Sequence, residues 1–505
     1  MVFIILAVYF CLNALKLNHM IMRLTRLLFL LFVFCTTAVF SQVGIGTVNP
    51  DASSALDISS TTQGLLAPRM TTAERLAITT PANGLLVYDI TTLSFYYFNG
   101  TNWVEVLSTT VPARDNYKLV KDITDLADEL TAGGGSQYQL NSDFLYEING
   151  TIVFDYPIDL NGANIIGRDT SQDIIVNGFS GALFSGGNGG RLKDLLISGG
   201  GQPVFNITSD GSQSLIGYSV VINNASSLGT LSNFGTVFFE VLQVINTNNG
   251  FTFSNINSLF MEKVFWTETN TGTFLTLTGT FQNLQIANGR IVVDTGETGL
   301  NVSSNPTIGS SASLTGINFT GAGNKVQGYT ANTYTGYDFT NFWDVDCQGI
   351  PQETDNNAIG DYNLSFNTGT GAFTTYTGSG IPVKVSGITA TNNLFRFRAV
   401  GNNRLVYEGK RTRYFSVTAS ISFRGNTNND VLLFYVAKGI SGNTTASPLL
   451  ETGTASEIVT NFNIGAVPVV GTVQLSPGDF VEIWTERDSG VGANVYVASL
   501  NMVIR

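Results

Sequence analysis

The chain has 505 residues, only 12% of them charged, and its 37 acidic and 25 basic side chains give a net charge of −12. This charge excludes a general basic field, so we expect no nucleic-acid partner. The 54 glycines, 34 phenylalanines and 18 tyrosines are typical of strands and tight turns, which predicts an all-β chain with several domains.

Residues 1–41 have the three-part layout of a secretory signal peptide. Met22–Arg26 forms a short basic region, and Leu27–Phe34 is an unbroken apolar run. Small and tolerated residues then precede an expected cleavage point ahead of Gln42. The pattern predicts a secreted, extracellular or cell-surface protein.

The apolar stretch before this basic region, Met1–Leu17, allows two interpretations. A true start at Met20 or Met22 would leave these residues outside the protein, and we favour this interpretation. The alternative is a transmembrane hairpin. No later segment has the run of about 20 apolar residues that a spanning helix needs, so we expect no membrane span in the mature chain.

Removal of this leader would change the chemistry that is available to the chain. It removes the only histidine, His19, together with Cys11 and Cys35, and leaves Cys347 as a lone thiol. Three basic residues and no acidic ones are lost, so the net charge becomes −15. A mature chain of this kind has no internal disulfide, no Ser-His-Asp or Cys-His catalysis and few means of binding a transition metal. We therefore expect no cofactor and no metal.

Residues 42–110 are predicted to form a small N-terminal attachment module. Thr71 with Glu74 three residues later is a capping-box pattern, which predicts a short helix over 72–78. A strand is expected over 84–89. The pair Asn99-Gly100 between two aromatic-rich runs predicts a hairpin.

Four segments of this module resemble segments of known protein families. The module resembles the N-terminal part of many secreted proteins of Bacteroidetes-type bacteria, and similar segments occur in phage tail-fibre proteins. This resemblance implies an extracellular address and an attachment or spacer role. The segments are Val43-Gly44-Ile45-Gly46-Thr47, Ala55-Leu56-Asp57-Ile58-Ser59-Ser60, Gly64-Leu65-Leu66-Ala67-Pro68-Arg69-Met70 and Gly100-Thr101-Asn102-Trp103.

Residues 111–137 are predicted to form a helical connector. Leu119, Ile123, Leu126 and Leu130 lie at spacings of four, three and four residues, which is one apolar stripe on a helix. One interpretation is a short trimeric coiled coil. We favour a helix that caps the next domain, because fewer than three heptads rarely suffice for a coiled coil.

Residues 138–345 contain short apolar strands that recur every 20–27 residues. Aligning Ile197, Ile222, Ile245, Phe265, Val292 and Phe319 gives steps of 25, 23, 20, 27 and 27. Repeats of this length without helical periodicity predict a solenoid of parallel strands. The expected strands cover 192–197, 215–222, 238–245, 259–266, 284–293 and 314–319.

The start of this region also resembles a known architecture. Tyr146–Ile152 and Pro157–Gly167 are similar to the first coils of right-handed parallel β-helix proteins of the pectate-lyase-like class, which phage tailspikes share. The resemblance implies the fold more strongly than any function.

Residues 350–505 are predicted to form an antiparallel jelly-roll sandwich, because many of their strands alternate apolar and polar residues. Tyr414–Phe423 and Leu475–Trp484 resemble the trimeric jelly-roll heads of the tumour necrosis factor and complement type. That resemblance implies that Phe434, Tyr435, Phe480 or Trp484 lies at a subunit contact; ordinary core packing is the favoured alternative for each. The expected strands cover 381–385, 394–400, 405–408, 414–423, 431–437, 472–475, 480–485 and 495–504.

Candidate site residues lie in the solenoid. Glu240 and Glu262 occupy similar places in consecutive coils, which stack about 4.8 Å apart, close to the carboxylate separation of a retaining glycosidase. Asp194 is expected two coils before Glu240. An outward polar position in an alternating strand explains these acids equally well, and we favour it.

Further residues are expected around these acids. Lys263, Glu268 and Arg290 are placed nearby, and Phe260 or Trp266 is a candidate for stacking on a sugar ring. For Trp266 we favour a place in the core.

Two functions from different classes remain open. The first is a homotrimeric surface-display protein or tail-fibre-like adhesin that recognises a polysaccharide or cell-surface glycan, and we favour it. The second is a polysaccharide lyase or glycoside hydrolase of the tailspike type. A groove lined by two acids and exposed aromatic rings would favour the second function. A solenoid, or shaft, whose surface has no such groove would favour the first.

Overall fold

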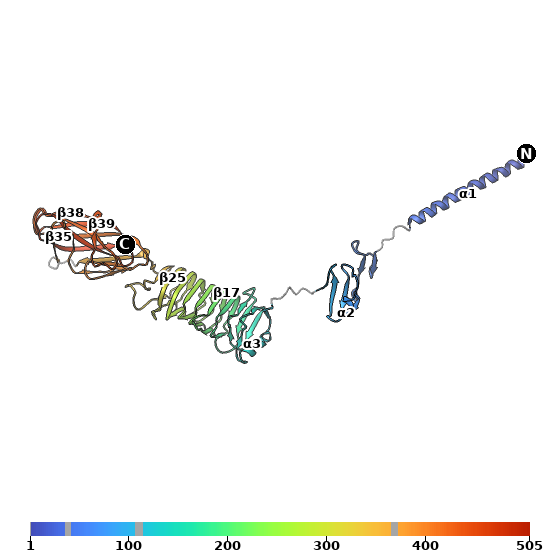
Figure 1. Cartoon of the computed structure of the whole chain (residues 1–505), viewed down its shortest axis with the longest axis horizontal. Coiled ribbons are helices and arrows are strands. Elements are labelled where there is room, and N and C mark those ends of the chain that lie inside the picture. Colours follow the sequence, from blue (N-terminus) through green and yellow to red (C-terminus); the bar gives the residue numbers. More distant parts are fainter. Residues whose placement is uncertain (1, 36–41, 107–114, 365–371) are drawn as a thin grey trace. The chain divides into compact units, whose positions relative to one another are not determined.

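The computed structural model describes residues 2–35, 42–106, 115–364 and 372–505. The chain divides into two compact units, Met1–Pro112 and Ala113–Arg505, and Figure 1 labels some of their helices and strands.

The first unit begins with one continuous helix, α1 (Val2–Cys35), which contains both apolar stretches of the expected leader. Among the described residues, no helix has both the length and the hydropathy that crossing a membrane requires. The expected cleavage point adjoins residues 36–41, and the expected connector begins within 107–114. Both segments lie outside the described residues.

The module after this helix contains two small sheets. β1 (Val43–Ile45) pairs in parallel with β2 (Leu56–Ile58). The predicted capping box is confirmed, because Thr71 and Glu74 exchange both hydrogen bonds ahead of α2 (Thr72–Leu76). The predicted hairpin at Asn99-Gly100 is also present. The second sheet has the order β3 (Arg69–Met70), β4 (Leu86–Asp89), β5 (Ser94–Phe98) and β6 (Trp103–Glu105).

This module buries very little apolar surface. Between residues 42 and 106, Ala67 and Val87 are the only buried apolar side chains. Val48, Leu66 and Leu93 are 94%, 73% and 72% exposed. A core of this size is far smaller than independent folding normally needs, so these exposed side chains lack the cover that a partner surface would supply.

The second unit begins with a parallel β-helix, as the repeats predicted. Its larger sheet joins one strand from nearly every coil, and each strand pairs in parallel with the strand of the coil before and after. The strands are β7 (Tyr117–Val120), β9 (Leu145–Ile148), β12 (Asn164–Ile166), β15 (Gly190–Ser198), β17 (Ser214–Asn223), β19 (Thr236–Ile245), β21 (Ser258–Trp266), β23 (Thr280–Val292), β25 (Thr307–Thr320) and β27 (Trp343–Gln348), with β10 (Thr151–Phe154) and β13 (Ile174–Asn177) beside them.

A second sheet of nine parallel strands closes each coil. One apolar core fills the space between the sheets along the whole solenoid, from Val120 to Cys347. The strands are β8 (Tyr138–Gln139), β11 (Ile158–Asp159), β14 (Phe184–Gly186), β16 (Pro203–Thr208), β18 (Ser227–Ser232), β20 (Phe251–Ser254), β22 (Thr273–Thr278), β24 (Thr298–Asn301) and β26 (Asn324–Gln327).

A column of left-handed residues bends each long strand of the larger sheet. Asp194, Ser219, Val241, Lys263 and Asn288 have φ values of 52°, 52°, 56°, 55° and 57°, and each falls at the same place in its coil. Such a residue turns the chain at a corner and shifts the alternation of inward and outward side chains by one position.

Because of this shift, the alignment of the coils predicted from the sequence was only partly correct. The inward column after the corner is Ile197, Ile222, Val244, Trp266, Ile291 and Phe319. The prediction was correct at its first two members and its last one. It was wrong by one residue at Ile245, Phe265 and Val292. Phe265 is 39% exposed, whereas Trp266 is fully buried, as expected.

The start of the solenoid also differs from the prediction. Leu119 belongs to strand β7, so the helical stripe that included it is interrupted. A 3-10 turn (Ile123–Leu126) and the short helix α3 (Ala127–Ala132) follow. Leu126 is buried, and Ile123 and Leu130 pack on the same core, so these turns cover the first coil. A coiled coil is not formed here.

The C-terminal head is a sandwich of two antiparallel sheets around a separate apolar core. Seven of the eight strands expected from the sequence are present, and the order in the two sheets is that of a jelly roll. The expected strand 394–400 is instead divided at Arg396, whose φ is 59°, into two short strands that belong to different sheets. The first sheet has the order β31 (Thr389–Ala390), β28 (Ile359–Leu364), β41 (Asn494–Ile504), β35 (Arg413–Gly425) and β39 (Ile464–Leu475), with β29 (Ala372–Thr375) and β32 (Leu394–Phe395) beside them. The second has the order β33 (Phe397–Ala399), β34 (Leu405–Tyr407), β40 (Phe480–Ser489), β36 (Val431–Gly439) and β37 (Ser447–Pro448), with β30 (Val383–Lys384) and β38 (Thr454–Glu457).

Buried charges join the head to the last coil of the solenoid. Arg396 is 1% exposed, and its guanidinium donates hydrogen bonds to the carbonyl oxygens of Asn341, at 2.6 Å, and Trp343. Its Nε lies 3.6 Å from Oδ1 of the buried Asp355, whose Oδ2 accepts a hydrogen bond from the Lys410 backbone N–H. Buried charges persist only where such partners surround them, so these contacts fix the geometry of the junction.

Glu353 lies beside this cluster and is also buried. Its two oxygens accept hydrogen bonds from the backbone N–H groups of Asp338, at 2.8 Å, and Phe339, at 3.1 Å. Burial nevertheless raises the pKa of this carboxyl from 4.5 to about 7.

The corrected register makes a prediction about stability. We expect Trp266→Ala to lower the free energy of unfolding by about 3–5 kcal/mol, because it opens a cavity in the core. Phe265→Ala, one position away, should cost about 1 kcal/mol or less, because the ring faces solvent. Denaturant unfolding followed by circular dichroism measures both losses, and equal losses would contradict the register.

The raised pKa of Glu353 predicts how the stability of the protein depends on pH. Between about pH 4.5 and 7 the folded carboxyl holds a proton that the unfolded one has released, so its contribution to stability is complete below pH 4.5 and is lost as the pH rises to about 7. Relative to Glu353→Gln, the wild-type protein should lose about 3 kcal/mol across this window. Urea unfolding at several pH values measures the difference. A difference that does not vary with pH would show that the prediction is wrong.

Candidate functional site

A strip of aromatic and charged side chains lies on the outward side of three consecutive strands, β17, β19 and β21. Alternation within each strand turns five of these side chains away from the core, a sixth, Lys263, lies at the left-handed corner, and all are at least part-exposed. We call this set the outer strip: Tyr218, Phe238, Glu240, Phe260, Glu262 and Lys263.

The parallel register orders the outer strip into two columns. Tyr218, Glu240 and Glu262 are successive partners in one column. Phe238 and Phe260 are partners in the next. The predicted stacking of the two glutamates is therefore present, and Phe260 faces outward as a sugar-stacking residue would.

Each glutamate of the pair has a polar partner. The Lys263 ammonium lies 3.1 Å from Oε1 of Glu240 and so joins two consecutive coils. Oε1 of Glu262 accepts a hydrogen bond of 2.7 Å from the Asn288 side-chain amide. Each carboxylate is therefore already bound to a side chain of the following coil.

The aromatic rings extend the outer strip toward earlier coils. The Tyr218 and Phe238 ring centroids are 5.3 Å apart, and the Arg191 guanidinium carbon lies 5.6 Å from the Tyr218 ring centroid. The glutamates, Phe238, Phe260 and Lys263 line a shallow hollow of about 350 Å³, together with Met261 and Gln285. This hollow offers ring faces beside carboxylate, ammonium and amide groups.

Three of the residues expected near the glutamates lie elsewhere. Asp194 is in the left-handed corner column, where it pairs with Lys193 at 3.4 Å, and Lys193 is the true partner of Tyr218. Arg290 pairs with Phe265 on the side of the coil after the corner, and Glu268 follows the end of β21. The one-residue shift at the corner explains the misplacement of Asp194.

Sequence reasoning missed Tyr218 and Gln285. Tyr218 precedes Glu240 by 22 residues, which is the same step that separates Glu240 from Glu262, so the repeat length alone could have identified it. Gln285 follows Phe260 by 25 residues because its coil is longer, and only the register reveals this partnership.

The aromatic residues singled out in the head are mostly buried within one chain. Phe434 lies in the sandwich core with its ring centroid 4.8 Å from that of Phe423. Tyr435 and Phe480 are 4% and 3% exposed, and the Arg404 guanidinium covers the Phe480 ring at 3.8 Å. Trp484 is part-exposed, and its indole N–H donates to Glu482. Phe434 therefore packs in the core of the sandwich, which was the favoured alternative to a subunit contact.

Comparisons with known proteins agree with the expected resemblance at the N-terminus. Residues 44–118 match a family described as a phage tail like trimerisation region. This match and the parallel β-helix support the resemblance to phage tail-fibre and tailspike proteins. A search of curated proteins found no significant match.

A search of solved structures found proteins similar to parts of this chain. Eiger TNF from S. frugiperda has 10% identity and a TM-score of 0.22, with 30% of this chain and 93% of that chain covered. Murine APRIL has 13% identity and a TM-score of 0.20, with 29% and 98% covered. The enzymatically active domain of bacteriophage CBA120 tailspike protein 4 has 10% identity and a TM-score of 0.21, with 87% and 77% covered. Scores of this size support no statement about function or assembly.

Proposed function

We propose that this chain is an extracellular, trimeric, tail-fibre-like protein whose β-helix shaft binds glycan through the outer strip. The observation that carries the proposal is the outer strip itself, in which aromatic rings and hydrogen-bonding charges repeat from coil to coil. The extracellular address rests on the leader-like residues 1–41.

The outer strip has the two kinds of group that a glycan needs. Part-exposed ring faces at Tyr218 and Phe260 can stack on the C–H faces of sugar rings, and the glutamates and Lys263 can bond sugar hydroxyls. Because adjacent coils are about 4.8 Å apart, similar contacts recur along the shaft. A repeating ligand such as a polysaccharide fits this repetition better than a single small molecule.

The N-terminal module supports the trimer. Its match to a trimerisation region coincides with a core of only two buried apolar residues. Side chains such as Val48 and Leu66 remain largely exposed in one chain. Association with two further copies would cover them.

The head supplies a second surface suited to self-association. The outward positions of β35 and β39 are exposed but carry no charge over most of their length, and Tyr414, Ile464 and Val470 are 68%, 60% and 58% exposed. A flat, uncharged face loses little on desolvation when a second copy covers it. The exposed uncharged residues are Tyr414, Ser416, Thr418, Ser420, Ile464, Ala466, Pro468, Val470, Thr472 and Gln474.

Glycan cleavage is the second candidate function, and the direct pairing of Glu240 with Glu262 favours it. Two carboxyl groups about 5–5.5 Å apart serve retaining glycosidases. If the pair is catalytic, the protein releases reducing ends from a polysaccharide, and Glu240→Gln and Glu262→Gln each abolish the release.

The trimer is tested by light scattering on the purified protein. We expect three times the mass of one chain. Leu66→Asp should lower this mass, because it places a charge on the exposed apolar surface of the module. Val153→Asp, at a position 52% exposed on the solenoid, should leave it unchanged. A monomeric wild-type protein would overturn this part of the proposal.

Glycan binding is tested on a polysaccharide and oligosaccharide array. We expect Phe260→Ala and Tyr218→Ala each to weaken binding about tenfold, which corresponds to the loss of one stacked ring. Phe265→Ala removes a part-exposed ring on the other side of the corner and serves as the matched control. Equal effects of all three substitutions would contradict a role of the outer strip.

A further inference from the structure

A groove lies where the last coil of the solenoid meets the head. Its first hollow, of about 580 Å³, is lined by residues 332–335 and Asn341 of the solenoid and by head residues between 391 and 408. A second hollow of about 320 Å³ adjoins it and shares Asn332 and Asn341. We call the two together the junction groove, and their combined size lies in the range of small-ligand sites.

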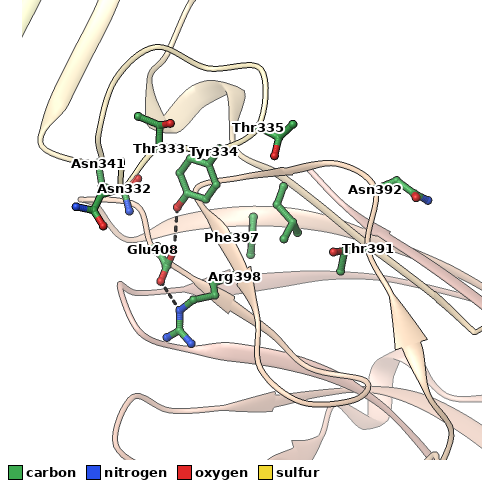
Figure 2. A pocket seen from close by; sticks show the side chains of 11 residues that line it. Asn332, Thr333, Tyr334, Thr335, Asn341, Thr391, Asn392, Phe397, Arg398 and Glu408 are labelled. Atoms are coloured by element: carbon green, nitrogen blue, oxygen red, sulfur yellow. Dashed lines mark hydrogen bonds and ion pairs between the residues drawn. The ribbon is translucent and has the colours of Figure 1, made fainter. Parts of the chain in front are cut away.

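The first hollow contains a preset cluster of polar groups. The Tyr334 hydroxyl donates a 2.9 Å hydrogen bond to Oε2 of Glu408, and the Arg398 Nε lies 2.6 Å from Oε1 of the same carboxylate (Figure 2). The Tyr334 ring packs edge-on against Phe395, with the centroids 5.4 Å apart. The orientation of Tyr334 is therefore fixed before any ligand arrives.

The rest of the lining is rich in uncommitted amides and hydroxyls. Within the described residues, the side chains of Asn332, Thr333, Thr335 and Thr391 make no hydrogen bond to another residue. Amides and hydroxyls can both donate and accept hydrogen bonds, as the hydroxyls of a sugar do. Arg398 uses only its Nε, so its two terminal nitrogens also remain available.

The second hollow adds an apolar platform. Phe342 is 48% exposed at its edge, although its backbone carbonyl accepts a 2.9 Å hydrogen bond from the Lys410 ammonium. The neighbouring Asn341 carbonyl is held by Arg396. The head thus positions the part of the solenoid that carries the exposed ring.

Charge selects the class of ligand. Arg398 and Glu408 are the only charged residues that line either hollow, and they neutralise each other. The Arg398 guanidinium and the Glu408 carboxylate are already paired, so the lining offers neither an anionic nor a cationic ligand a charge that lacks a counter-ion.

From this geometry we infer that the junction groove is a second carbohydrate site, separate from the outer strip, that binds a neutral oligosaccharide of at least two rings. One ring packs against Tyr334 in the first hollow, and the next lies over Phe342. The amides of Asn332 and Asn341 bond hydroxyls between them. This inference goes beyond the proposed function and does not require the outer strip to bind anything.

The test uses the full-length protein on an array of neutral and acidic oligosaccharides, with affinities measured for those that bind. A background carrying Tyr218→Ala and Phe260→Ala removes the outer strip. In this background we expect binding of neutral oligosaccharides to persist. Asn332→Gly and Phe342→Ala should each weaken it about tenfold.

Two matched controls accompany these variants. Asn332 has a φ of 60°, so glycine removes its amide without straining the backbone, and Asn429→Gly makes the same change at an exposed head residue with a φ of 64°. Phe373→Ala removes an exposed ring, 62% accessible, on another part of the head. Neither control should change the affinity.

The outcomes separate the two sites. Loss of all neutral oligosaccharide binding in the Tyr218→Ala/Phe260→Ala background overturns the junction groove and leaves the proposed function standing. Binding of acidic glycans only, or binding that survives both Asn332→Gly and Phe342→Ala, also overturns it. If the Tyr218→Ala/Phe260→Ala protein binds with wild-type affinity and Asn332→Gly and Phe342→Ala weaken that binding, the junction groove is a carbohydrate site. The outer strip is then not the glycan-binding surface of the proposed function.

Discussion

The parallel pairing of each coil with its two neighbours is the constraint on which the rest of the solenoid depends. Each strand inside the larger sheet bonds to the strands of the coils before and after, so along most of the solenoid each side chain has a fixed place in a column. Inward columns form the core, and outward columns form the outer strip. A single coil has no core of its own, and the stack as a whole supplies one.

Much of this architecture could be predicted from the sequence, because apolar strands at a regular spacing need only hydrophobicity and repeat length. The stacking of Glu240 on Glu262 followed from the same spacing. The register could not be read to the residue, because the left-handed corner falls on residue types that do not signal it. Asn288 is typical of that conformation, but Val241 and Lys263 are not, and the backbone of the coils imposes it on them. The predictions placed Phe265 in the inward column and Asp194 in the column of Glu240. Both were wrong because the sequence does not reveal the corner residue that breaks the alternation of each strand.

The junction between solenoid and head lay beyond sequence reasoning for a different reason. Arg396 meets Asn341 across 55 positions of sequence, and Tyr334 meets Glu408 across 74. Neither pair belongs to a repeat or a motif, and the segment between β26 and β27 has no periodicity. The junction groove forms where two folds meet. Its residues are far apart in the sequence and come together only in the folded chain.

The solenoid also has a consequence for the way such a chain can change in evolution. Because one coil touches only the coils directly before and after it, duplication or deletion of a whole coil would lengthen or shorten the shaft while both ends keep their existing contacts. Each added coil would extend the outward columns by one further place, and partial insertions would be confined to the loops at the corners. The length of the solenoid could then be adjusted in discrete steps without redesign of the head.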